Sequence, residues 1–226
     1  MLRAALVFLL TATAAQSEGI ARATYAEPTT RYAHGVLGDA VEWGALQLTT
    51  DAGRRLTIRL PATRVFEDLA PRLVDLDRDG ANEVLTIETD VNLGARLSVY
   101  GADGLVASNG FIGRANRWLA PLGAADLDGD GRIEIASVDR PHLAKTLMIW
   151  RQDGPRLVRV AQLEGVTNHR IGDDYISGGI AACGAMVVAD AVWSRALAVT
   201  WDGTDFATRD LGPIRNRASL DPARAC

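Results

Sequence analysis

The sequence predicts an all-β fold, a small β-propeller of about four blades with four antiparallel strands each. The first observation is a repeat: four segments that alternate apolar with other residues start 51, 50 and 50 residues apart. They are LQLTTDAG from Leu46, LSVYGADG from Leu97, LMIWRQDG from Leu147 and LAVTWDG from Leu197. Each ends in an Asp/Gly turn, which is typical of a strand that enters a hairpin. Second, helical periodicity is nearly absent after the N-terminal leader. Four-stranded units of about 50 residues are typical of propeller blades.

A second set of aspartates, at equivalent positions of the four repeats, defines the other elements of each repeat. Asp39, Asp90, Asp139 and Asp190 each end an apolar run. Each repeat therefore consists of a strand, a turn, a second strand, the Asp/Gly turn and a third strand. The segments LAPRLVD from Leu69 and LAPLGAAD from Leu119 are candidates for the fourth strand.

These elements predict one domain over residues 18–226, with repeats at about 22–68, 69–118, 119–170 and 171–215. Residues 216–226 are expected to close the fold, because NRASLDP resembles NRWLAP at the start of an earlier inner strand. This strand could pair near the N-terminal segment ARATYAEP, which would hide a sheet edge.

The N-terminus is predicted to be a signal peptide over residues 1–17. Arg3 precedes a twelve-residue apolar run, Ala4 to Ala15, and small residues follow. A membrane span needs roughly 20 apolar residues, so this run is too short. A buried N-terminal helix is the alternative. We expect a periplasmic or secreted protein with no membrane span after cleavage.

Composition and cysteine content add two limits. The chain has 226 residues, 48% of them hydrophobic, and a net charge of −4, so it lacks the basic footprint of a nucleic-acid-binding protein. Cys183 and Cys226 could form a disulfide outside the cytoplasm, but the sequence does not show that they meet. The alternative is one buried cysteine and one loose thiol.

Two acidic loops carry the strongest chemical signal. DLDRDGANEV starts at Asp75 and DLDGDGRIEI starts at Asp126, 51 residues later. Carboxylates at loop positions 1, 3 and 5 converge on one centre, glycine at position 6 allows the sharp turn, and the carbonyl at position 7 can face the same centre. Such hard oxygen ligands suit calcium, and without a cation the carboxylates would repel. A metal-free Asp/Gly turn is the alternative.

These loops are not EF-hands, because position 12 is Thr86 in one and Ser137 in the other. The pattern resembles the FG-GAP/VCBS repeat family, calcium-loop β-propellers related to the integrin α head. The resemblance implies two calcium ions that each tie two strands of a blade together. The ligands it implies are Asp75, Asp77, Asp79, the Ala81 carbonyl and Glu83 in one loop, and Asp126, Asp128, Asp130, the Arg132 carbonyl and Glu134 in the other. The family usually has seven blades, whereas this chain has room for about four, and the first and fourth repeats lack the acidic loop.

A candidate ligand face lies just before the inner strands, where polar and aromatic residues gather. It comprises Arg117, Trp118, His169, Arg170, Asp174 and Tyr175. Equivalent positions in a propeller share one face, so these residues could surround a central channel and bind a ligand. A polar ring that only closes the blades is the alternative.

The sequence thus predicts a non-catalytic binding or scaffolding module for a protein or glycan of the cell envelope. The alternatives are an envelope hydrolase or polysaccharide lyase on a calcium-stabilised propeller, and a purely structural envelope component. An enzyme should show a deep pocket with a perturbed acid or base.

Overall fold

The structure is a computed structural model that describes residues 18–226, so the predicted signal peptide, residues 1–17, lies outside the described residues. This part of the chain is all-β, as predicted, with two short 3-10 helices near its C-terminus. No helix within it is long and apolar enough to cross a membrane.

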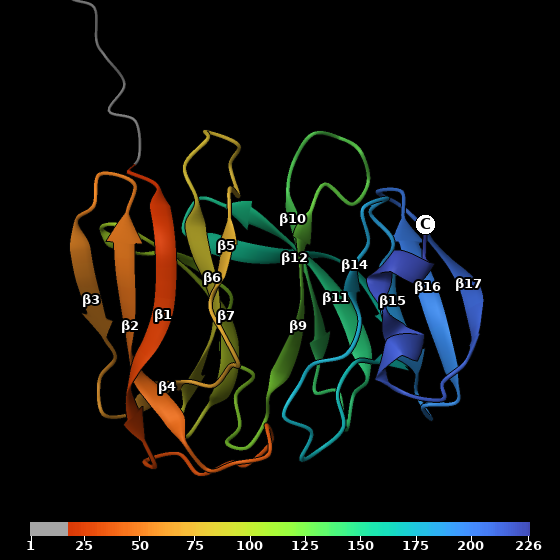
Figure 1. The fold of residues 1–226 in the computed structure, drawn as a ribbon, viewed down its shortest axis with the longest axis horizontal. Coiled ribbons are helices and arrows are strands. Elements are labelled where there is room, and N and C mark those ends of the chain that lie inside the picture. The colour runs from red at the N-terminus through yellow and green to blue at the C-terminus, as the bar shows by residue number, and fades with distance from the viewer. Residues whose placement is uncertain (1–17) are drawn as a thin grey trace, which may run out of the picture.

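The strands form four groups in chain order (Figure 1). The first group has β1 (Ile20–Thr29), β2 (Glu42–Thr50), β3 (Arg55–Arg59) and β4 (Arg64–Phe66); the second has β5 (Arg72–Val74), β6 (Glu83–Asp90), β7 (Gly94–Gly101) and β8 (Gly104–Ser108). The third has β9 (Leu119–Ala125), β10 (Glu134–Asp139), β11 (Thr146–Asp153) and β12 (Arg156–Glu164); the fourth has β13 (Val166–Thr167), β14 (Gly179–Ile180), β15 (Met186–Asp190), β16 (Arg195–Trp201) and β17 (Phe206–Pro213).

Antiparallel pairing dominates within the groups, and two weaker links join the first three. Strand β4 pairs with β2 through Trp43 and Phe66 and also with β6, while β8 meets β12 at a single parallel pair, Ser108 and Arg156. These links make one curved twelve-stranded sheet, and the fourth group forms a separate five-stranded sheet. Figure 1 shows the first and last groups at opposite ends of the longest axis.

Apolar side chains on alternate faces of the inner strands pack against different neighbours. On β6, Val84 joins a cluster with the first group, whereas Leu85 joins a cluster with the third. On β10, Ile135 faces the second group and Ala136 the fourth. The strand period of two sends successive side chains to opposite faces, so the middle groups are covered on both sides.

The C-terminal segment differs from the expected inner strand. It forms the 3-10 helices η1 (Arg217–Leu220) and η2 (Pro222–Arg224), and among the described residues β1 pairs with β2 alone. Proline lacks the N–H that a central strand would donate but suits the start of a helix, where Asp221 caps it through the Ala223 N–H at 2.9 Å. Leu220 and Ala225 pack instead against β15 and β16.

Residues between β1 and β2 connect the first group to the fourth group and to the segment between β8 and β9. The Gly172 N–H donates to the Val36 carbonyl at 3.2 Å, and the Asn116 N–H donates to the Tyr32 hydroxyl at 2.8 Å. Gly38 has φ of +93°, and a Cβ there would lie 3.0 Å from the Gly172 carbonyl oxygen. This approach needs glycine, and it brings distant parts of the chain to one end of the molecule.

Candidate metal centre

Both acidic loops join the first and second strands of their groups at the same end of the molecule. Residues 75–82 link β5 to β6, and residues 126–133 link β9 to β10, at the top of Figure 1. Gly80 and Gly131 each have φ of +90°, the left-handed conformation that glycine adopts without steric cost. The predicted role of glycine at position 6 is therefore consistent with the turn in both loops.

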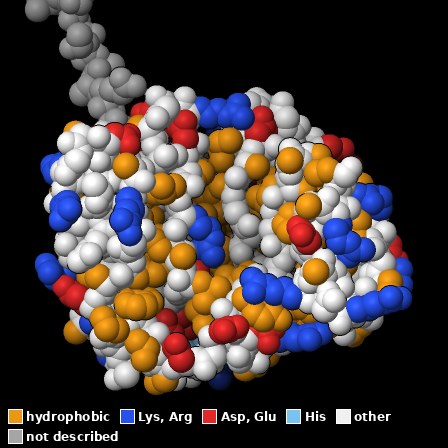
Figure 2. Space-filling view, viewed as in Figure 1, with side chains coloured by type: hydrophobic (Ala, Val, Ile, Leu, Met, Phe, Trp, Pro, Cys, Tyr) orange, Lys and Arg blue, Asp and Glu red, His pale blue; other side chains and the backbone are white. Residues whose placement is uncertain are grey.

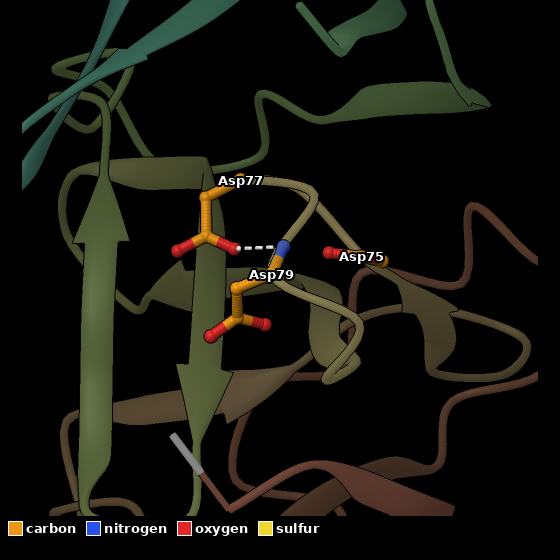
Figure 3. A group of neighbouring side chains, drawn as sticks. All are labelled: Asp75, Asp77 and Asp79. Atoms are coloured by element: carbon orange, nitrogen blue, oxygen red, sulfur yellow. Dashed lines mark hydrogen bonds between the residues drawn. The ribbon is translucent and has the colours of Figure 1, made fainter. Parts of the chain in front are cut away.

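In the first loop the three aspartates converge. One oxygen atom from each of Asp75, Asp77 and Asp79 lies within 4.8 Å of the others, and Figure 3 shows the side chains extending from one loop toward a common space. The three carboxylates also fix the loop by accepting backbone N–H groups: Gly80 donates to Asp75 at 3.1 Å, Asp79 to Asp77 at 3.2 Å and Ala81 to Asp79 at 2.8 Å.

Glu83 completes this cluster from the first residue of β6. Its Oε2 accepts the Leu76 N–H at 3.1 Å. Burial, and then the nearby Asp77, Asp79 and Asp75 carboxylates, raise the pKa of Glu83. Asp75 Oδ1 is buried and has no hydrogen-bond partner. An orphaned carboxylate oxygen beside three other carboxylates fits a hard divalent cation, which would relieve both the desolvation and the repulsion.

The second loop repeats this backbone arrangement. Asp126, Asp128 and Asp130 each offer an oxygen within 4.8 Å of the others. Gly131 donates to Asp126 at 3.0 Å, Asp130 to Asp128 at 3.1 Å and Arg132 to Asp130 at 2.9 Å. Glu134 accepts the Leu127 N–H at 2.9 Å, as Glu83 accepts that of Leu76. Two acidic triads in this protein could therefore hold a metal ion.

Arginine distinguishes the second loop from the first. Arg151 on β11 lies 2.6 Å from Asp128, 2.8 Å from Asp130 and 2.6 Å from Glu134. The backbone N–H of Arg132, and then Arg151, lower the pKa of Asp130. Arg151 is not among the residues predicted from the sequence, although the repeat contains a signal for it: LMIWRQDG has arginine where LSVYGADG has Gly101.

The predicted ligand face divides in the structure. Arg117 and Trp118 line a pocket of about 320 Å³ together with His34, Asn116, Arg140, His142, Leu143 and Ile171. His169 is buried beside it, with Nδ1 2.9 Å from His142 Nε2. The other three predicted residues do not line this pocket. Arg170 lies over the Trp193 ring, the Tyr175 ring lies under Arg217, and Asp174 lies beside Gly38.

This pocket lies at the other end of the strands from the acidic loops, since Arg117 precedes β9 whereas the second loop follows it. His34 Nδ1 is 2.6 Å from the buried Glu67, which also accepts the Thr89 hydroxyl at 2.6 Å. Burial, and then His169, lower the pKa of His142 to about 4. His34, Glu67 and His142 are not part of the predicted ligand face, because no spacing pattern in the sequence connects them.

The molecular face in Figure 2 shows acidic and basic side chains interspersed rather than gathered into one basic patch. Comparisons with protein-family models, with curated proteins and with solved structures found no match to this chain. The functional conclusion therefore rests on the chain's own geometry.

Proposed function

We propose that this protein is an exported calcium-binding β-propeller of the FG-GAP/VCBS type, a non-catalytic binding or scaffolding module for a protein or glycan of the cell envelope. The observation that carries it is the loop at residues 75–83. Its carboxylates converge, its backbone is already fixed by its own side chains, and Asp75 keeps a buried oxygen without a partner. Calcium prefers this oxygen-rich, weakly directional ligand set.

Two further observations support the propeller and its export. The second and third groups pack on both faces, as blades in a propeller do, and the groups follow one another in chain order. A disulfide joins Cys183 to Cys226, with their Cα atoms 5.9 Å apart. Disulfides persist mainly in oxidising compartments, so the bond favours a periplasmic or secreted protein.

Calcium binding is tested by thermal unfolding of chelator-treated protein. We expect the melting temperature to rise with added calcium, because an ion that binds only the folded state adds about 2.7 kcal/mol at a hundredfold excess over its dissociation constant. Asp77→Ala should reduce this response, whereas Asp103→Ala, at an exposed turn of the same group, should keep it. Calorimetry that detects no heat of binding for the wild type at millimolar calcium would refute the calcium proposal.

Export is tested separately. The native protein should lack residues 1–17, because the leader has the charged start, apolar run and small-residue end of a cleaved signal. N-terminal sequencing of the protein from its native host measures this directly. An intact Met1 in a cytoplasmic fraction would contradict export without affecting the calcium proposal.

An envelope hydrolase or lyase is the second candidate, favoured by His34, which lines the pocket and pairs with the buried Glu67 behind it. A histidine oriented by a carboxylate can act as a general acid or base. His34→Gln should abolish glycan cleavage if the pocket is catalytic. Intact envelope glycans after incubation with the wild type favour the binding module.

A further inference from the structure

The two acidic loops share one backbone design but differ in how their charge is balanced. In the loop at residues 126–134 all four carboxylates pair with arginine: Asp128, Asp130 and Glu134 with Arg151, and Asp126 with Arg78 at 3.3 Å. In the loop at residues 75–83, the described part of the chain provides no ion pair to Asp75, Asp77, Asp79 or Glu83. Arg78 belongs to this loop, yet its guanidinium extends to Asp126 of the other.

The difference originates at one cross-strand position. Trp150 pairs with Ile135, so the next residue, Arg151, lies opposite Glu134. Tyr100 pairs with Val84 in the same way, so Gly101 lies opposite Glu83. The second group thus has no side chain where the third group has a guanidinium. The repeat supplies a fixed cation to one loop and leaves the other without it.

Arg151, on strand β11, is held firmly against the loop at residues 126–134. Its side chain is 16% exposed, its guanidinium reaches three carboxylates, and it lies 5.5 Å from the centre of the Trp201 ring. Arginine cannot lose its charge in a protein, so it is a permanent counter-ion. A divalent ion that enters this loop must displace Arg151 from these partners or accept a like charge beside it.

We propose that Arg151 is the built-in cation of the loop at residues 126–134, so that this protein has one tight calcium site, the loop at residues 75–83. This inference rests on the proposed calcium-binding function and replaces the expectation of two equivalent ions. The second loop binds calcium only after Arg151 is removed.

The test is calorimetric titration of chelator-treated protein with calcium chloride, in four forms. We expect one ion per chain for the wild type and two for Arg151→Met, which keeps much of the side-chain volume without the charge. Gly101→Arg should lose the ion, because it places a guanidinium opposite Glu83. Its Cβ would approach the partly exposed Val106 side chain at 3.1 Å, which can move. Arg159→Met, an exposed arginine on the adjacent strand β12, is the matched control and should keep one ion.

The outcomes separate the two proposals. Two equivalent ions in the wild type would overturn the role of Arg151 while calcium binding stands. No ion in any of the four forms would overturn calcium binding itself. An ion in Arg151→Met alone would show that the loop at residues 126–134 binds calcium once Arg151 is removed and that the loop at residues 75–83 does not bind it, which would overturn the inference.

Two further variants keep the proposal testable if Arg151→Met folds poorly. Asp77→Ala in the wild-type background should abolish the single ion, whereas Asp128→Ala should leave the count at one. Loss of the ion in Asp128→Ala, with retention in Asp77→Ala, would place calcium in the arginine-filled loop and refute the inference.

Discussion

Glu42, at the start of β2, is a buried acid in an acidic neighbourhood. It is 3% exposed. Burial, and then the Glu67, Asp39 and Asp68 carboxylates, raise its pKa to about 9. The folded protein therefore holds a proton on Glu42 that the unfolded chain releases above its ordinary pKa of about 4.5. Stability from this group is complete below that value and falls as the pH rises toward 9.

Glu42→Gln should remove this pH dependence, since glutamine stays neutral. We expect the variant to be more stable than the wild type at pH 8, on the order of a few kcal/mol, and to match it near pH 4. Urea unfolding at the two pH values measures the difference. Glu164→Gln, at an exposed position, is the control, and an equal gain in the control would contradict this account.

Sequence reasoning at this scale identified residues that act through local spacing. The aspartates and the glycine of each acidic loop stand at positions 1, 3, 5 and 6 of one short segment. The spacing within that segment is therefore enough to predict that the carboxylates converge. Arg151 and the pair of His34 and Glu67 act across strands or across groups. Their partners depend on strand register and on how the groups curve together, which one sequence does not display.

At the scale of elements, the C-terminal segment is attached to the fourth group rather than to the N-terminal strand. The Cys183–Cys226 bond spans 43 positions of sequence, and Arg224 donates to the Leu211 carbonyl at 2.8 Å. Cross-linking a chain over this length removes denatured-state entropy worth about 4 kcal/mol. The bond also holds the C-terminal segment, with Leu220 and Ala225, against the small side chains of β15 and β16.

The double change Cys183→Ala with Cys226→Ala should therefore lower the free energy of unfolding by about 2–4 kcal/mol. Calcium binding should persist, because both acidic loops lie in the second and third groups. Denaturant unfolding with and without reductant measures the first effect, and calorimetry the second. A wild type that is equally stable in reductant would show that the bond contributes nothing.

Most strands could be predicted because alternation of apolar residues and Asp/Gly turns is a local property. The C-terminal strand was expected from the likeness of NRASLDP to NRWLAP, but Leu119 continues into β9 whereas Asp221 and Pro222 begin a helical turn. The short likeness predicted the wrong element because Asp221 caps a helical turn, whereas Ala120 takes its place in NRWLAP and Pro121 lies within strand β9.

For the whole molecule, the buried clusters span group boundaries. One cluster holds Val138 and Ile149 of the third group with Met186 and Val188 of the fourth. No middle group can unfold without exposing its neighbours' apolar faces, so we expect a single cooperative transition. Removal of residues 166–226 would expose this cluster and should unfold or aggregate the remainder.

Thermal unfolding followed by far-ultraviolet circular dichroism and by tryptophan fluorescence measures this, and we expect the two unfolding transitions to coincide. The five tryptophans are at positions 43, 118, 150, 193 and 201, so all four groups or their junctions contribute to the signal. Two separated transitions would show that the groups unfold independently.

The connection from Val36 to Gly172 has a consequence for folding kinetics. Nearly all strand pairs join segments close in sequence and can form early, but this hydrogen bond closes a very long stretch of chain. Contacts between residues so far apart in sequence have the largest entropic cost of loop closure, and this cost precedes any stabilisation from the contact itself. The segment between β1 and β2 should therefore order last during refolding and open first in the native state. The pocket that contains His34 would then be completed only in the final step of folding.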